Sequence, residues 1–109
     1  MKAGRALDAL IATKVMGWKV EKDPVNGCRD QSGEWYFDVP HYSTSIEAAW
    51  EVVEKLKDLC LMVDVQCSKN FHQVQVEKYE DGWAIVAEST EGSSAPHAIC
   101  LAALKAIQS

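Results

Sequence analysis

The sequence predicts an α+β fold with elements in the order α-β-α-β-β-β-α. Three segments repeat their apolar residues at the three- and four-residue spacing of helices, and four segments show the alternation or the aromatic and β-branched content of strands. Short turns separate the strands of the second half, which predicts a mainly antiparallel sheet. Of the 109 residues, 48% are hydrophobic and 25% are charged, as in ordinary folded chains. Chains of this length usually form one domain, so residues 1–109 are expected to fold as a single soluble domain.

The first helix is predicted over residues 3–17. Its apolar residues recur at helical spacing: Leu7, Leu10, Ile11, Val15 and Trp18. Charged and polar residues fall mostly between them, so the helix has one apolar face. Gly17 lies where this pattern ends, and glycine is common just past the end of a helix.

A segment rich in turns and one strand are predicted next. The turn signals are Asp23-Pro24, Asn26-Gly27 and Ser32-Gly33. No long element is therefore expected between residues 20 and 34. Residues 34–39 place Trp35, Phe37 and Val39 at alternate positions, which predicts a strand that either ends at Pro40 or lies at the edge of a sheet. Trp35 and Phe37 are expected in the core with Tyr36 exposed; the alternative is that both are aromatic anchors for a partner.

The second helix is predicted to begin with a capping box. In residues 44–47 the hydroxyl of Thr44 would accept from a backbone N–H one turn further on, while Glu47 reaches back to the cap. The apolar face of this helix follows helical spacing: Ile46, Ala49, Trp50, Val53, Leu56 and Cys60. Glu51 and Lys55 lie opposite, at the spacing of a favourable ion pair.

Three antiparallel strands are predicted to follow. Residues 61–66 and 72–77 alternate apolar and polar side chains around a turn at residues 68–70, and an Asp-Gly turn at residues 80–82 leads to a strand over residues 83–87. Gln73, Gln75 and Glu77 share one face of the hairpin. That face is therefore expected to be exposed to solvent.

The last helix is predicted over residues 97–107, with Ser94, Ala95 and Pro96 as its cap and first turn. The helix is apolar nearly all round, so it is expected to be buried on more than one side. The predicted core combines the inward residues of all these elements: Leu7, Ile11, Trp50, Val53, Leu56, Val63, Val65, Val74, Val76, Ile85, Ile99 and Leu104.

The charge pattern argues against two classes of partner. The formal net charge is -5, and the 11 lysine and arginine residues are scattered along the chain. Such a pattern offers no basic stripe to phosphates or anionic lipids, so neither a nucleic-acid partner nor a membrane partner is predicted. Charged residues interrupt the N-terminal segment, which is unlike a signal peptide or a membrane span. A cytoplasmic location is expected.

The four cysteines, Cys28, Cys60, Cys67 and Cys100, are expected to be reduced, with Cys60 and Cys100 packed as small thiols in helices. The alternative is a metal site formed by Cys60, Cys67 and His72. Their spacing matches no zinc pattern, and a fourth ligand is missing. No metal-binding residue and no cofactor are therefore predicted.

No catalytic motif is present: the chain has no phosphate-binding glycine loop, no nucleophile elbow and no metalloprotease or calcium motif. A relay of Ser43, His41 and Asp38 is conceivable, but positions so close in sequence rarely converge as a relay requires. His41 is expected in an exposed loop, while His72 and His97 are expected to pack or to face solvent. No catalytic residue is predicted.

Three blocks of the sequence resemble the phage ABA sandwich domain, a family of small phage and prophage proteins. They are KAGRALD with KVMGW (residues 2–8 and 14–18), YSTSIEAAW with VEKL (residues 42–50 and 53–56) and APHAICLAAL (residues 95–104). The resemblance implies an α/β/α sandwich and a phage or prophage origin. It implies no reaction, cofactor or catalytic residue.

The leading functional hypothesis is a non-enzymatic module that binds a host or phage protein by surface complementarity. One alternative is a small enzyme or small-ligand binder whose site lies between the Trp35 strand and the second helix, where a deep pocket would favour it. The other alternative is a homo-oligomeric structural component, which a large apolar patch on the uncovered face of the sheet would favour.

Overall fold

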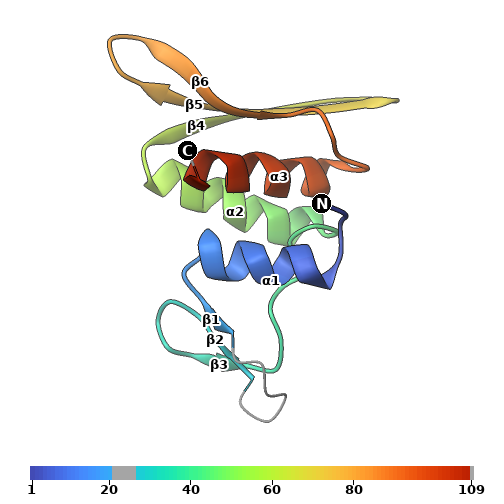
Figure 1. Cartoon of the computed structure of the whole chain (residues 1–109), viewed down its shortest axis with the longest axis vertical. Helices are drawn as coiled ribbons and strands as arrows, with labels where there is room; N and C mark the ends of the chain where they lie inside the picture. The colour runs from blue at the N-terminus through green and yellow to red at the C-terminus, as the bar shows by residue number, and fades with distance from the viewer. Residues whose placement is uncertain (21–26, 109) are drawn as a thin grey trace.

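The computed structural model of the chain describes residues 1–20 and 27–108, which form three helices and two three-stranded antiparallel sheets (Figure 1). The elements in chain order are α1 (Arg5–Lys14), β1 (Lys19–Val20), β2 (Cys28–Arg29), β3 (Trp35–Tyr36), α2 (Ile46–Asp58), β4 (Leu61–Ser68), β5 (Phe71–Tyr79), β6 (Trp83–Ser89) and α3 (Ala95–Gln108). The predicted α+β class is confirmed. Where the sequence predicts one strand between the first two helices, the structure has three strands of two residues each.

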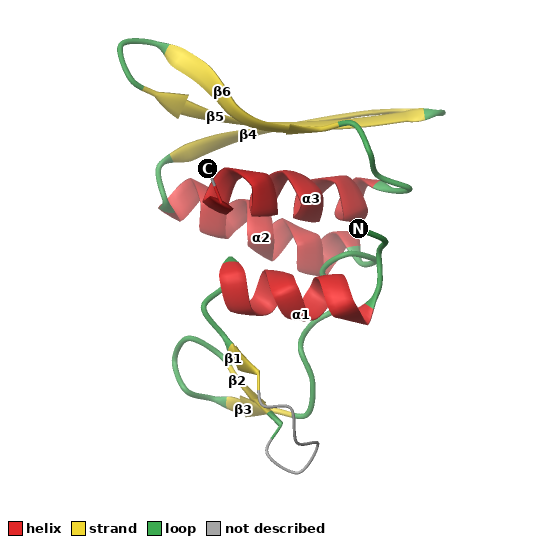
Figure 2. Cartoon of the chain, in the orientation of Figure 1, coloured by secondary structure: helices red, strands yellow, loops and turns green. Residues whose placement is uncertain are grey.

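The layers follow one another along the longest axis of the molecule (Figure 2). The large sheet, with strand order β4-β5-β6, lies at one end and packs on α3 and α2. Helix α1 lies beneath these two helices, and the small sheet β1-β2-β3 lies at the opposite end. The helices therefore cover one face of the large sheet, and no described element covers its other face.

The register of the large sheet follows the alternation in the sequence. Val63 lies opposite Val76 and Val65 opposite Val74, and all four side chains point toward the helices. The turn between β5 and β6 uses backbone conformations with positive φ, 58° at Asp81 and 126° at Gly82. Aspartate and glycine tolerate these conformations better than most residues, which explains the Asp-Gly signal.

Helix α3 is the centre of the core. Every residue from Pro96 to Leu104 is buried, because α3 lies between β5 and β6 on one side and α1 and α2 on the other. The small side chains of Ala98, Ala102 and Ala103 are fully buried in this contact. The prediction that this helix is buried on more than one side is confirmed.

A buried polar cluster ties the start of α1 to the segment before α2. The Oδ1 atom of Asp8 accepts hydrogen bonds from the backbone N–H of Ser43 (2.8 Å) and from its hydroxyl (2.6 Å). The hydroxyl of Ser43 accepts in turn from the N–H of Gly4 (2.9 Å), while Arg5 donates to the other oxygen of Asp8 (2.9 Å). Asp8 and Ser43 are fully buried, and these bonds satisfy their polar atoms. This cluster joins the first two sequence blocks in space.

The predicted core is wrong at two positions, Trp50 and Ile85, which are 50% and 51% exposed. Helix α2 buries a face that includes Val52, so Trp50 lies at the solvent edge of the helix. In β6 a bulge opposite Val76 and Glu77 inserts Val86 as an extra residue. The alternation is broken there, so Ile85 points to the face opposite Ala87.

The start of α2 is also shifted by one residue. Ser45, not Thr44, is the N-cap, and its hydroxyl accepts from the N–H of Ala48 at 3.3 Å. The predicted pair between Glu51 and Lys55 is absent, because the Lys55 ammonium donates to the Gln31 side chain at 3.3 Å. The predicted turns at Asp23-Pro24 and at Asn26 lie outside the described residues.

The prediction that Trp35 and Phe37 belong to the core is wrong. Trp35 is 38% exposed and Phe37 is 86% exposed, and their rings contact each other at a centroid distance of 4.6 Å. Strand β3 lies at the edge of a sheet whose strands have only two residues, so it has no face broad enough to cover the helices. Val39, beyond the strand, is the residue of this segment that reaches the core.

Candidate functional site

A cleft of about 510 Å³ lies between the small sheet and α2. We call it the acidic cleft. Its lining comes from several segments of the chain: Met16, Trp18, Asp30, Gln31, Ser32, Tyr36, Asp38, Pro40, Tyr42 and Glu51. The cleft thus occupies the region between the Trp35 strand and the second helix, where the sequence analysis places a possible ligand site. Its volume is within the usual range of small-molecule sites.

Three carboxylates face the acidic cleft. Oδ1 of Asp30 accepts from the Ser32 hydroxyl (2.6 Å) and from two backbone N–H groups, and these bonds hold the pKa of Asp30 below its ordinary value. The pKa of Asp38 is also lowered, first by the hydrogen bond from its neighbour's backbone N–H and then by Arg5, whose guanidinium lies 2.8 Å away. Glu51 has no ion-pair or hydrogen-bond partner among residues 1–20 and 27–108. The cleft therefore carries an excess of negative charge.

Aromatic side chains form much of the remaining wall. The rings of Trp18 and Tyr36 are 5.1 Å apart at an angle of 39°, and the Tyr36 hydroxyl donates to Glu34 at 3.0 Å. Tyr42 is only 1% exposed, and its hydroxyl has no hydrogen-bond partner in the described part of the chain. Burial raises the pKa of Tyr42, and the charge of nearby Glu51 raises it further, so the phenol is neutral.

Among the described residues that line the acidic cleft there is no histidine, cysteine, lysine or arginine. Carboxylates and hydroxyl groups can also act in acid-base or nucleophilic catalysis. The lowered pKa values of Asp30 and Asp38 keep both carboxylates ionised, and their hydrogen bonds and ion pair already occupy them. What the cleft does offer is carboxylate oxygens, a phenol oxygen and aromatic faces.

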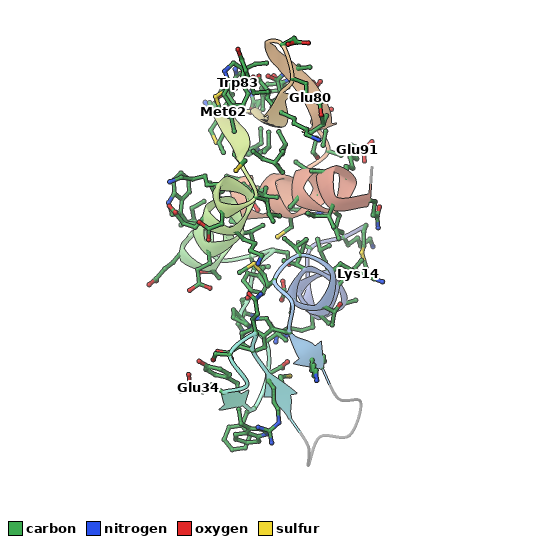
Figure 3. The ribbon with its side chains drawn as sticks, turned by 90° about the vertical axis from the view of Figure 1, so that its left-hand side faces the viewer. Lys14, Glu34, Met62, Glu80, Trp83 and Glu91 are labelled. Atoms are coloured by element: carbon green, nitrogen blue, oxygen red, sulfur yellow. The ribbon has the colours of Figure 1, made fainter. Side chains whose placement is uncertain are left out.

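The second notable surface is the outer face of the large sheet, which points away from the helices. Since Val74 and Val76 point inward, the odd-numbered residues of β5 and the residues paired with them point outward. One end of this face carries four exposed side chains that we call the outer-face cluster: Met62, Tyr79, Trp83 and Ile85. The rings of Tyr79 and Trp83 are 5.4 Å apart, and Figure 3 shows Trp83 and Met62 near each other at this end of the molecule.

Carboxylates lie beside the outer-face cluster along the sheet, while Lys57 of α2 lines the same hollow as Met62, Tyr79 and Trp83. Glu77 lies opposite Met62 on one neighbouring strand and opposite Ile85 on the other, and Asp64 and Glu88 also point outward. No lysine or arginine occupies an outward position on β4, β5 or β6. The outer face therefore combines exposed apolar area with negative charge.

The structure does not assemble the conceivable relay of Ser43, His41 and Asp38. Ser43 is buried, and its hydroxyl is hydrogen-bonded to Asp8 and to the N–H of Gly4. Asp38 pairs with Arg5. His41 is exposed in its loop, as expected, and lies 4.0 Å from the buried carboxylate of Asp8. His97 is buried and packs: its Nδ1 accepts from the N–H of Ser93 at 3.1 Å.

The cysteines do not converge on a metal site. Cys67 and His72 lie opposite each other on β4 and β5, but Cys60 lies at the other end of β4, roughly 20 Å along the strand. Within the described ranges no group of three potential ligands could hold a metal ion. All four cysteines are free. Burial raises the pKa of Cys100 to about 12, whereas Cys60, which we expected to pack as a small thiol, is exposed.

The chain folds as a small α+β protein whose helices lie between two antiparallel sheets. The sequence model of the phage ABA sandwich domain matches residues 9–104, so the chain belongs to this family. No curated protein and no solved structure matches the chain. No helix in the described ranges is long and apolar enough to cross a membrane.

Proposed function

We propose that this member of the phage ABA sandwich family is a non-enzymatic protein-binding module that binds its partner through the outer face of the large sheet. The observation that carries the proposal is the outer-face cluster. Contiguous exposed apolar patches that contain large aromatic residues are unusual on monomeric proteins and often mark interaction sites. Tryptophan and tyrosine, both present in the cluster, are also the residues most enriched among interface hot spots.

The charges of the outer face favour a different protein over a second copy of this chain. A homo-oligomer built through this face would bring Asp64, Glu77 and Glu88 of two copies together, and like charges in contact oppose association. The partner that fits is a host or phage protein with an apolar centre flanked by lysine or arginine. Nucleic acid and anionic membranes carry the wrong charge.

The acidic cleft supports the non-enzymatic part of the proposal, because its described lining has no histidine, cysteine or lysine, and two of its three carboxylates are held ionised by their own partners. In this proposal residues 1–109 act as one domain in the cytoplasm of the host cell and need no cofactor. A small enzyme remains the alternative, and among the described lining residues it would have to use a carboxylate or a hydroxyl group as the reacting group.

The test is affinity capture of the tagged chain from phage-infected or prophage-induced cells, followed by titration of the purified partner. The double variant Trp83→Ser, Ile85→Ser should lose the partner. The matched control is Phe37→Ser, which alters a more exposed apolar residue directly after β3 and should retain the partner. Strand β3 belongs to the small sheet, on the opposite side of the helices (Figure 1). A hot-spot loss of about 2 kcal/mol predicts that Trp83→Ser alone raises the Kd by about 30-fold.

Two results would contradict the proposal. One is that the double variant Trp83→Ser, Ile85→Ser, here called the cluster variant, binds the partner with the same affinity as the parent chain. The other is light scattering that shows the parent chain as a dimer and the cluster variant as a monomer, which would favour the homo-oligomer. Phe37 is 86% exposed, so the stability of its variant is expected to stay within about 0.5 kcal/mol of the parent. Trp83 and Ile85 are 53% and 51% exposed, so the double variant loses some buried apolar area, and its circular dichroism spectrum must match that of the parent before binding is compared.

A further inference from the structure

We infer that the acidic cleft binds an organic cation with N–H donors, of the alkylguanidinium or alkylammonium type. The cleft is separate from the outer-face cluster, since the helical layer lies between the small sheet and the large sheet (Figure 1). The inference is therefore independent of the proposed protein partner. It rests on three features that the described residues give the cleft: a carboxylate without an ion-pair partner among them, a phenol whose oxygen reaches the cleft, and an aromatic wall.

The unpaired carboxylate is Glu51. Asp30 is saturated at Oδ1 by three hydrogen bonds, and Asp38 is already paired with Arg5. Glu51 faces the same cleft from α2 without an ion-pair partner among the described residues. A carboxylate in this position is available to accept charge-assisted hydrogen bonds from a ligand, and a guanidinium can give two at once.

The phenol is Tyr42. Its exposed fraction is 1%, it lines the cleft, and the charges of Glu51 and Asp30 act on it. Its hydroxyl is not among the buried side-chain atoms that lack a hydrogen-bond partner in the described part of the chain, so its oxygen reaches the cleft. No described residue donates to this oxygen, so a ligand in the cleft can donate to it in place of water.

The aromatic wall favours an organic cation over a metal ion or a neutral ligand. Cations bind over the faces of tryptophan and tyrosine, and guanidinium groups also stack on them. The tilted pair of Trp18 and Tyr36 lies in the same lining as the carboxylates. A hard metal ion would instead need several converging oxygen ligands, and no group of three potential ligands within residues 1–20 and 27–108 is arranged to hold one.

The ligand chemistry has two possible sources, a free small molecule and an arginine side chain on a protein. The probes are therefore N-butylguanidinium and a blocked peptide, acetyl-Gly-Gly-Arg-Gly-Gly-amide. N-butylurea, which has nearly the same shape without the charge, is the neutral control. Binding is followed by the NMR signal of the Trp18 indole N–H.

N-butylguanidinium should shift the Trp18 signal in a saturable way, and N-butylurea should bind at least about tenfold more weakly. Glu51→Gln should weaken the cation by about tenfold and Tyr42→Phe by about threefold, because one removes a charged acceptor and the other a neutral one. The matched control Glu91→Gln removes the same charge beside α3, away from the cleft, and should leave the Kd unchanged (Figure 3).

The inference is overturned if N-butylguanidinium leaves the Trp18 signal unmoved, if N-butylurea binds equally well, or if Glu51→Gln binds like the parent. Peptide binding as tight as that of N-butylguanidinium would assign the cleft to an arginine side chain. Weaker peptide binding would assign it to a free cation. The spectra of the variants also report folding, so a lost site is distinguished from an unfolded chain.

Discussion

Replacing Ser43 by alanine should destabilise the chain strongly, because its hydroxyl joins two segments inside the core. The substitution removes the 2.6 Å bond to the Asp8 carboxylate and the 2.9 Å bond from the N–H of Gly4. A hydrogen bond to a charged group contributes about 1.5 to 3 kcal/mol, and a buried donor left unpaired costs about 1 to 3 kcal/mol. Since Asp8 keeps its bonds from the Ser43 N–H and from Arg5, we expect a net loss of about 3 kcal/mol.

Urea denaturation followed by circular dichroism measures this loss. With a slope of about 1.5 kcal/mol per molar urea, the midpoint should fall by about 2 M. Ser68→Ala, at an exposed serine, is the control and should stay within about 0.5 kcal/mol of the parent. A midpoint for Ser43→Ala within the error of the Ser68→Ala control would refute the reasoning about the buried cluster.

Three further predictions follow from the structure. In urea denaturation Ser45→Ala should cost about 1 kcal/mol and Thr44→Ala much less, because Ser45 is the N-cap; equal losses would contradict this assignment. Phe37→Ala should leave the free energy of unfolding within about 0.5 kcal/mol, and a loss near 3 kcal/mol would restore a core role. Burial raises the pKa of Cys100 from 9.0 to about 12, so its neutral thiol stabilises the fold fully below about pH 9, and this contribution falls as the pH rises toward 12. The urea midpoint should therefore fall less between about pH 8 and about pH 10.5 in Cys100→Ala than in the parent, and identical falls would contradict the buried thiol.

Most of the regular elements could be predicted because their signals are local. In β4 and β5 the alternation of apolar and polar residues matches which side chains face the helices. In α3 the uniformly apolar sequence matches its burial on more than one side. The errors arise where local patterns allow two answers. Three hydroxyl residues, Ser43, Thr44 and Ser45, directly precede α2, so the cap could be placed at more than one of them. The bulge at Val86, which turns Ile85 outward, depends on pairing with β5.

The acidic cleft could not be predicted in detail, because its residues come from segments that only the tertiary fold brings together. In the sequence, Glu51 belongs to a polar helix face of the kind that is usually solvated. The residues around it do not indicate that Trp18 and Tyr36 lie across the cleft. Tyr42 stands next to Ser43 in a sequence block of the family, but its place in the wall of the cleft is visible only in the structure. The sequence also does not reveal the outer-face cluster, because the alternation in the third strand of the large sheet predicts that Ile85 lies in the core.

The most direct test of the proposed binding module is an NMR map of the ¹⁵N-labelled chain titrated with its purified, captured partner. The proposal predicts that chemical shifts change along the outward positions of β4, β5 and β6, with the largest changes at Met62, Tyr79, Trp83 and Ile85. Shift changes confined to the helices or to the small sheet, with these four residues unaffected, would contradict it.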